Sequence, residues 1–271
     1  MFESLDADDP RLAPYRNVSD RDLLRSSGVF VAEGRLVVRR VIEDRRYRIA
    51  SIVVNDAARH DLADVLERAA STAPVFVADA RVLEELTGYH VHRGCLAFVE
   101  RPSLPSIDYV VAREGVVVVL EGVTNADNVG GIFRNAAAFG AAGVVISPTC
   151  CDPFYRKAVR TSMGAVLQVP FARAESWPDA LGRIRTAGRR IVALTPHASS
   201  ESLREFARSH GPSRIALLAG TEGEGLSVAA RDVADARVRI PMAAGTDSLN
   251  VAVAVGIALY ALQPTRPTCP T

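Results

Sequence analysis

The first hundred residues alternate between two hydrophobic patterns. Short apolar runs rich in β-branched side chains are separated by segments with the roughly 3.6-residue period of a helix. The apolar runs are Val29–Ala32, Ile49–Asn55, Val75–Ala78 and Cys95–Val99, and the helical segments lie near Arg35–Arg45, Asp61–Ala70 and Val82–Leu86. This alternation predicts a small α/β domain.

Further along the chain the apolar runs are nearly continuous, which is typical of parallel strands buried on both faces. The runs are Val116–Leu120, Gly143–Ser147, Val166–Pro170, Arg190–Leu194, Arg214–Leu218 and Arg237–Pro241. With helical segments between them, they predict a second α/β domain built on a parallel sheet. Between the two patterns lies Arg101–Ser106, where two prolines disfavour both helix and central strand. We therefore expect one domain at residues 1–104 and another at 107–271.

Ligands of open parallel sheets bind beyond the carboxyl ends of the strands. The loops at those ends begin near Glu121, Ser147, Thr195, Gly220 and Pro241. The first loop leads into a helix that Asp127 or Asn128 is expected to cap. The residues three and four positions from Arg134 on that helix are Gly130, Gly131, Ala137 and Ala138. Its guanidinium is expected to stand on a face cleared for a substrate backbone, or to snorkel to solvent as an ordinary surface arginine.

Two other loops are rich in glycine or polar residues. Leu218–Leu226 has three glycines within six positions, so its backbone can bend sharply and offer N–H groups to a ligand, or form a plain turn before a helix. Ile240–Val251 leads into an apolar helix, with Ser248 as the expected N-cap and Asn250 in the first turn. A polar pair at the start of so apolar a helix indicates a pocket.

Arginines gather at two further places. Arg156 and Arg160 lie four positions apart on one face of a predicted helix. Arg39 and Arg40 open a second cluster, which acidic neighbours dilute. Each cluster is expected either to grip phosphates or to form a solvated charged face.

Metal and nucleophile chemistry finds little support. His90, His92 and Cys95 have no second cysteine or histidine pair at zinc-site spacing, so we interpret them as a turn before a strand and expect no metal. The G-x-S-x-G and H-E-x-x-H patterns of hydrolases are missing from the sequence. The N-terminus has no signal-peptide pattern, and the longest apolar stretch, Val251–Leu262, is too short to span a bilayer. A cytoplasmic protein with reduced cysteines and no membrane segment is expected.

Three segments taken together resemble the signature motifs of the SpoU family of RNA ribose methyltransferases, in the SPOUT superfamily. They are Asn125-x-x-Asn-Val-Gly-x-x-x-Arg-Asn-Ala136, Leu218-x-Gly-x-Glu-x-x-Gly-Leu226 and Ile240-Pro-Met-x(5)-Ser-Leu-Asn-Val251. Arg156–Gly164 is similar to a further segment of the family. Val31–Gly34 and His92–Gly94 more faintly resemble the L30e-like substrate-binding domain that is often attached.

The resemblance implies a fold and an activity. The fold would be a C-terminal α/β SPOUT domain with a parallel sheet and a trefoil knot, preceded by a small N-terminal L30e-like α/β domain that binds RNA. The protein would be a homodimer that uses S-adenosylmethionine to methylate a ribose 2′-hydroxyl of rRNA or tRNA.

The resemblance also implies roles for individual residues. It gives catalytic roles to Arg134, Asn128, Glu222, Ser248 and Asn250. It implies that the cofactor binds at Leu218, Gly220, Ile240, Met242, Ser248 and Leu249. RNA is expected to contact Arg134, Arg156, Arg160, Arg39 and Arg40. The small residues of the last helix, such as Ala252 and Gly256, would pack at the dimer interface or inside one subunit.

Two other functions stay open: a nucleotide-dependent α/β enzyme of ordinary doubly wound topology, and a non-catalytic RNA-binding protein that keeps the fold. The first predicts a glycine fingerprint after the first strand of the second domain, which the sequence lacks. A net charge of +1 argues at first against a nucleic-acid partner. However, residues 1–106 hold 15 basic and 17 acidic side chains, and residues 107–271 hold 17 and 14, so the total conceals a mildly basic second half.

Overall fold

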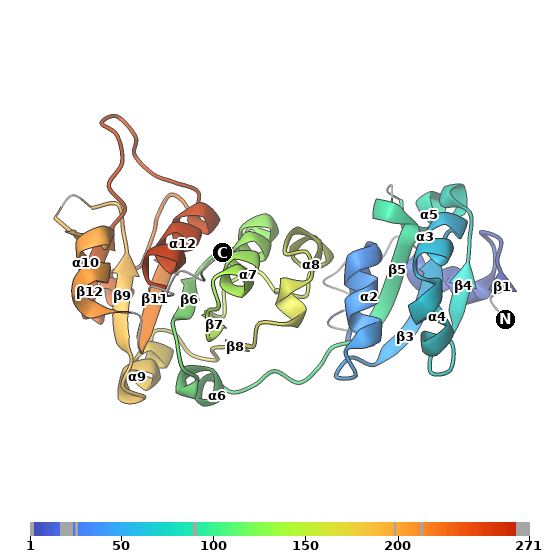
Figure 1. The fold of residues 1–271 in the computed structure, drawn as a ribbon, viewed down its shortest axis with the longest axis horizontal. Helices are drawn as coiled ribbons and strands as arrows, with labels where there is room; N and C mark the ends of the chain where they lie inside the picture. The colour runs from blue at the N-terminus through green and yellow to red at the C-terminus, as the bar shows by residue number, and fades with distance from the viewer. Residues whose placement is uncertain are drawn as a thin grey trace, which may run out of the picture. The chain divides into compact units, whose positions relative to one another are not determined.

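The computed structural model describes residues 3–16, 24, 27–88, 91–197, 199–211 and 214–263. The chain forms two compact units (Figure 1). The first consists of Met1–Ser103 and Pro153–Leu167, and the second of Leu104–Asp152 and Gln168–Thr271. The segment Pro153–Leu167 packs with the first unit, although the sequence pattern assigned it to the second domain. No helix of the described part is long and apolar enough to cross a membrane.

The first unit contains a five-stranded mixed sheet with the order β1-β4-β3-β5-β2. Its strands are β1 (Glu3–Ser4), β2 (Val29–Glu33), β3 (Ile49–Val54), β4 (Val75–Val77) and β5 (Cys95–Glu100). The β1-β4 and β4-β3 pairs are parallel, whereas β5 runs antiparallel to both β3 and β2. The four apolar runs expected to be strands are therefore confirmed, and β1 is an additional short strand.

Helices and short 3₁₀ turns complete the first unit. They are η1 (Pro10–Tyr15), α2 (Arg35–Glu43), α3 (Asp56–Asp61), α4 (Ala63–Ala69), α5 (Ala80–Thr87), η3 (His92–Gly94), α8 (Arg156–Thr161) and η4 (Ala165–Leu167). The last two come from the inserted segment, which apolar and polar contacts anchor. Phe154 stacks on Phe30 of β2 with 4.7 Å between ring centroids. The Tyr47 hydroxyl donates to the Leu167 carbonyl at 2.7 Å.

The second unit contains a seven-stranded sheet with the order β10-β12-β9-β11-β6-β7-β8, and every pair in it is parallel. Its strands are β6 (Val117–Glu121), β7 (Gly143–Ile146), β8 (Phe171–Arg173), β9 (Arg190–Leu194), β10 (Glu201–Ser202), β11 (Ile215–Gly220) and β12 (Ala236–Arg239). The parallel sheet predicted from the continuous apolar runs is thus confirmed.

One of the six predicted strands is wrong. Val166–Pro170 does not form a strand: Ala165–Leu167 is a 3₁₀ turn, and the strand β8 begins only at Phe171. The turn follows Gly164, whose φ of +77° lies in the left-handed region that favours glycine and is not that of an extended strand. Val166 and Leu167 are nevertheless buried, and burial alone gives a turn the same apolar composition as a strand.

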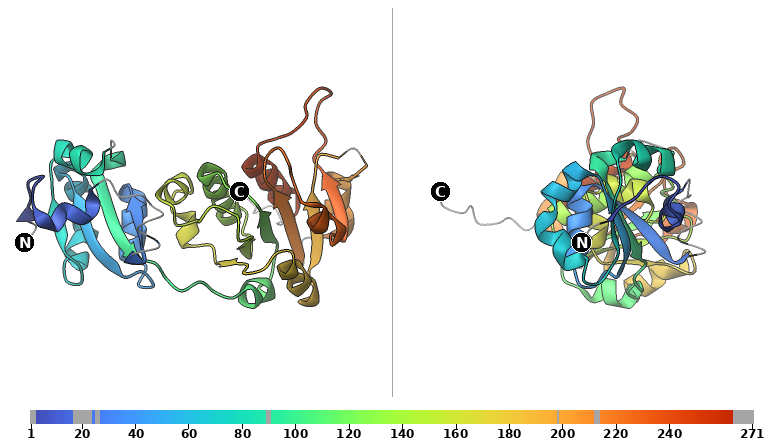
Figure 2. Two further views of the ribbon diagram at one scale, coloured as in Figure 1. Left: turned by 180° about the vertical axis from the view of Figure 1, so that it is seen from behind. Right: turned by 90° about the vertical axis from the view of Figure 1, so that its right-hand side faces the viewer.

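Helices cover both faces of the parallel sheet (Figure 1). On one face, α6 (Ile107–Ala112), α9 (Asp179–Thr186) and α11 (Val228–Asp232) share a core with Val117 and Val119 of β6. On the other face lie α7 (Ala126–Ala138), α10 (Leu203–His210) and α12 (Val251–Ala261). Successive residues of a strand point to opposite faces of the sheet. Because helices cover both faces, the residues of β6 that point to either face are apolar. The connection from β12 to α12 projects from this unit as a long loop (Figure 2).

The two helices α7 and α12 pack unusually closely because small residues meet at their contact. A Cβ atom on Gly131 would lie 2.9 Å from the Cβ of Ala252, and one on Gly256 would lie 2.7 Å from Asn135 Nδ2. The Asn135 amide donates to the Ala252 carbonyl at 2.7 Å. Ala252 and Gly256 thus serve packing inside one subunit.

A buried arginine ties three parts of the second unit together. Arg189 is 2% exposed, and its guanidinium donates to the carbonyls of Val111, Gly115 and Ile215 at 2.7, 2.7 and 3.2 Å. It also donates to the Arg113 carbonyl. A guanidinium has five N–H donors in a fixed fork, so no smaller cation can serve all four carbonyls.

We predict that replacing Arg189 with methionine lowers the free energy of unfolding by about 3 kcal/mol, because four carbonyls lose their donor inside the protein. Urea denaturation followed by circular dichroism measures this change. Arg204→Met, at an exposed position of α10, is the matched control and should cost less than about 0.5 kcal/mol. Equal stability of the two variants would contradict the assigned role of Arg189.

Candidate active site

A cavity of about 150 Å³ opens beyond the carboxyl ends of β9, β11 and β12, beside the start of α12. It brings together five of the six residues expected to bind the cofactor: Gly220, Ile240, Met242, Ser248 and Leu249. The sixth, Leu218, does not line it. The Leu218 side chain is fully buried in the core shared with α6, α9 and α11.

The glycine-rich loop after β11 folds back on the strand from which it leaves. A Cβ atom on Gly220 would lie 2.4 Å from the carbonyl carbon of Gly225, so no side chain fits there. The Gly225 N–H donates to the Thr221 carbonyl at 3.1 Å. Gly223 and Gly225 have φ values of +86° and +70°, which favour glycine. The sharp bend expected from the glycine spacing is therefore present.

Both helices that begin at the site are capped by asparagines that the sequence analysis did not choose. Asn125 caps α7, since its side chain accepts from the N–H groups of Asp127 and Asn128 at 2.8 and 3.4 Å. Asn250 caps α12, accepting from Ala252 N and Val253 N at 3.0 and 3.2 Å. Asp127, Asn128 and Ser248 were thus wrong as N-caps. Each helix starts at a different residue, so other side chains lie within reach of its free N–H groups.

The polar residues of the three motifs form one hydrogen-bonded network. Asn250 Nδ2 donates to Asn128 Oδ1 and to Glu222 Oε1, both at 2.7 Å. The Val251 N–H also approaches Glu222 Oε1, at 3.4 Å. With its oxygen used as the helix cap, the Asn250 amide has every donor and its acceptor engaged. Asn250 therefore cross-links segments separated by more than a hundred residues.

Arg134 lies on α7, about 1.7 turns beyond Asn128. Its side chain is exposed and makes no hydrogen bond or ion pair with the residues that the structure describes. The face of α7 around Arg134 was expected to be free of bulky groups, and the structure shows this for only part of it. Ala137 and Ala138 are exposed, but Gly131 is covered by Ala252 of α12. Gly131, which was expected to leave room for a substrate, instead allows α12 to pack closely against α7.

The other arginines expected to contact RNA have partners inside the first unit. Arg156 Nε and Arg160 Nη1 lie 3.7 and 3.4 Å from carboxylate oxygens of Glu33, whose side chain is fully buried. Arg39 binds Asp64 at 2.6 Å, and Arg40 donates to the Met163 carbonyl at 2.6 Å. These arginines help to hold the inserted segment and α2 in place.

The cysteine of the possible zinc pattern is a core residue. Cys95 is fully buried in β5, and burial raises the pKa of its thiol to about 12. His90 and the side chain of His92 lie outside the described part of the structure. Within the described part of the chain, no three His, Cys, Asp or Glu residues are grouped so that they could hold a metal ion.

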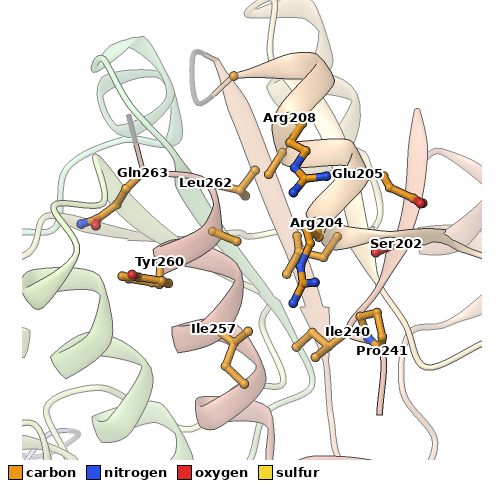
Figure 3. Close-up of a pocket in the computed structure, with 14 residues that line it drawn as sticks. Ser202, Arg204, Glu205, Arg208, Ile240, Pro241, Ile257, Tyr260, Leu262 and Gln263 are labelled. Atoms are coloured by element: carbon orange, nitrogen blue, oxygen red, sulfur yellow. The ribbon is translucent and has the colours of Figure 1, made fainter. Parts of the chain in front are cut away.

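A second, larger cavity of about 1020 Å³ lies between α10 and α12 (Figure 3). The side chains of Arg204 and Arg208 extend from α10, and Ile257 and Tyr260 lie on α12. Ile240 is the one motif residue that lines both cavities. Of the three side chains in the network of Asn250, Glu222 lines the smaller cavity.

Several residues that line the smaller cavity were not expected from the sequence. Thr195 and Pro196 line it from the end of β9, and Thr221 and Gly223 line it from the glycine-rich loop. The rule that ligands bind at the carboxyl ends of parallel strands had indicated the Thr195 loop, but no motif singled out a residue in it.

The sequence matches a known family over its second half. Residues 115–260 match the SpoU rRNA Methylase family. An uncharacterized tRNA/rRNA methyltransferase from Mycobacterium bovis is 45% identical over 259 residues, which cover 94% of this chain and 89% of the relative. Another, from Mycobacterium ulcerans, is 32% identical over 213 residues, covering 76% of this chain and 67% of that protein.

Solved structures of methyltransferases resemble the whole chain. The AdoMet-bound rRNA methyltransferase from Sinorhizobium meliloti has a TM-score of 0.82 and 26% identity, covering 96% of this chain and 97% of that one. An RNA 2′-O ribose methyltransferase has a TM-score of 0.76 and 25% identity, covering 97% and 98%. Because the family match spans more than half of the chain and the Mycobacterium bovis relative nearly all of it, this protein belongs to the SpoU rRNA methylase family.

Proposed function

We propose that this protein transfers a methyl group from S-adenosylmethionine to a ribose 2′-hydroxyl of rRNA or tRNA. The observation that carries the proposal is the network in which Asn250 joins Asn128 and Glu222 beside a cavity at the carboxyl ends of the sheet. Family membership and the AdoMet-bound relative from Sinorhizobium meliloti support the cofactor. The ribose as acceptor is supported by the relative described as a 2′-O ribose methyltransferase.

The residues around the cavity suit S-adenosylmethionine. Ile240, Met242 and Leu249 offer apolar contacts for an adenine ring, and the backbone of Gly220–Gly225 offers polar groups for its edges and for the ribose. The cavity of about 150 Å³ takes part of the cofactor, and the exposed Ile240–Asn250 loop covers the rest. The bound cofactor would supply an electrophilic methyl group on a sulfonium.

The acceptor hydroxyl must be aligned with the methyl carbon for in-line displacement. A ribose hydroxyl is a poor nucleophile at neutral pH, so negative charge that develops on its oxygen needs stabilisation. Arg134 is exposed, charged and uncommitted among the described residues, and it can anchor the target phosphate and stabilise this oxygen. Asn128, Glu222 and Asn250 hold the start of α7 against the cofactor loop, and Ser248 lines the cavity beside them.

The remaining expectations about fold and location are part of the same proposal. The first unit is an L30e-like RNA-binding domain, in which Arg39, Arg40, Arg156 and Arg160 contact phosphates. The C-terminal segment of the second unit forms a trefoil knot, which is supported by the return of α12 to the side of α7. A cytoplasmic location follows from an rRNA or tRNA substrate.

A homodimer is supported by an apolar stripe on α12. Val253, Ile257 and Tyr260 follow one another at helical spacing and are 50%, 39% and 68% exposed. Exposed apolar residues in such a row mark an interaction surface. The small residues on the opposite side of α12 are already used against α7, so this stripe is the face that a second copy would cover.

We predict that the purified protein transfers tritiated methyl groups from S-adenosylmethionine to RNA from a strain that lacks its gene, and much less to RNA from the parent strain. Mapping 2′-O-methylation in the two RNA pools should reveal a position that is modified only in the parent. The proposal would be contradicted if the methyl group that the deletion strain lacks were on the base and not on the ribose. It would also be contradicted if the protein transferred methyl groups to neither RNA.

We predict that Arg134→Ala abolishes detectable methyl transfer but leaves the dissociation constant of S-adenosylmethionine within about threefold, because Arg134 does not line the cavity. Isothermal calorimetry measures the binding and tritium transfer the activity. Arg183→Ala, on the exposed side of α9, is the matched control and should retain both. Loss of cofactor binding in folded Arg134→Ala protein would count against the assignment.

We predict that the protein sediments as a dimer at micromolar concentration and that Ile257→Arg shifts it to a monomer, since a charge cannot be buried unpaired at an apolar interface. Val228→Arg places the same charge at an isolated, 63% exposed valine of α11 and should leave the dimer intact. A parent protein that sediments as a monomer would overturn the dimer.

A further inference from the structure

A buried carboxylate that none of the three motifs accounts for lies next to the cavity. Glu121 is the last residue of β6 and is 9% exposed. In a parallel sheet this position is where a side chain can reach the loops at the carboxyl edge. A carboxylate withdrawn from water must be compensated by hydrogen bonds, so the donors around Glu121 indicate what it holds in place.

Three donors converge on this carboxylate. The Ser227 N–H donates to Glu121 Oε2 at 2.8 Å, and the Ser227 hydroxyl donates to Oε1 at 2.7 Å. The indole N–H of Trp177 donates to Oε1 at 2.6 Å. Trp177 belongs to the connection between β8 and α9 and packs against the core of the second unit. Trp177, which is anchored in the core, thus holds the carboxylate in place, and the carboxylate in turn binds Ser227.

Glu121 holds both ends of the loop Thr221–Leu226. Its backbone lies in register with Gly220, the residue from which the loop leaves β11. Its side chain binds Ser227, the residue at which the loop ends and which caps α11 through Ala230 N. The loop in between supplies Thr221, Glu222, Gly223 and Gly225 to the wall of the cavity.

We propose that Glu121, oriented by Trp177, is a positioning residue for S-adenosylmethionine that holds the Thr221–Leu226 loop closed as a wall of the cofactor site. The inference rests on the proposed function, because it assigns the cavity to that cofactor. Glu222 on this loop accepts a hydrogen bond from Asn250. The contact of Glu121 with Ser227 therefore also holds one end of the polar network. Opening the loop weakens cofactor binding, while Arg134, which is proposed to act on the ribose oxygen, lies on α7 outside the loop.

The test is Glu121→Gln, which keeps the shape of the side chain but turns an N–H₂ group toward donors that need an acceptor. The expected result is a dissociation constant for S-adenosylmethionine that is roughly 10- to 100-fold higher by calorimetry. The rate of methyl transfer to RNA at saturating cofactor should stay within about threefold of the parent, because the change acts on binding. A substitution that merely unfolded part of the protein would lower that rate and leave the affinity of the remainder unchanged.

Two measurements report the hydrogen bonds of Glu121 to Ser227 and Trp177 in the absence of cofactor. Hydrogen exchange at the Ser227 amide should be faster in Glu121→Gln, because this N–H loses its acceptor. Trp177 is the single tryptophan of the chain, so a change in intrinsic fluorescence reports the loss of its carboxylate partner directly. Glu175→Gln is the matched control: Glu175 is exposed, lies two positions from Trp177 and should alter neither readout.

A second variant keeps the test decisive if Glu121→Gln does not fold. Trp177→Phe removes one of the three donors and retains an aromatic ring, and it should raise the dissociation constant roughly three- to tenfold. Folded variants that bind S-adenosylmethionine as tightly as the parent would overturn the positioning role of Glu121. A parent protein that does not bind S-adenosylmethionine would overturn the proposed function itself, and the two failures are thereby distinguished.

Discussion

The arrangement of the site depends on the close contact between α7 and α12. Gly131 and Ala252 meet with no room for an added carbon, and Asn135 fixes the register through the Ala252 carbonyl. This contact brings the first turns of the two helices together, so that Asn128 and Asn250 are within hydrogen-bonding distance. A bulkier residue at the contact would separate the helices and break the network at the same time, because packing and polar chemistry share the same residues.

Much of the fold could be predicted from the sequence because parallel strands buried on both faces leave a strong apolar signal. The same signal failed at Val166–Pro170, where a buried turn has the composition of a strand. The site was predictable as a set of loops, since all parallel strands of a sheet end at the same edge. Which side chains meet there was less accessible. Leu218 belongs to a matching segment, yet strand alternation turns its side chain into the core.

The helix caps show why residue-level predictions are harder than predictions of elements. Asn125, Asp127 and Asn128 are all chemically able to cap α7, and a shift of the helix start by one turn decides between them. In the structure α7 begins at Ala126 with Asn125 as its cap, and it packs against α12, which is distant in the sequence. Asn128 does not cap the helix, and its side-chain oxygen accepts a hydrogen bond from Asn250 instead. In the same way, the pairing of Arg156 and Arg160 with Glu33 depends on the fold, because residues 123 and 127 positions apart in the sequence must meet.

The two walls of the small cavity differ in how firmly they are held. The Thr221–Leu226 wall is fixed at both ends, by the register of Gly220 with Glu121 and by the hydrogen bonds of Ser227 to the same residue. The Ile240–Asn250 wall is exposed over most of its length. Ordering an exposed loop around a ligand costs conformational entropy, whereas a wall that is already closed binds without that cost. On the proposed assignment of this cavity to S-adenosylmethionine, affinity would therefore depend on the wall that is already closed, which Glu121 fixes at both ends.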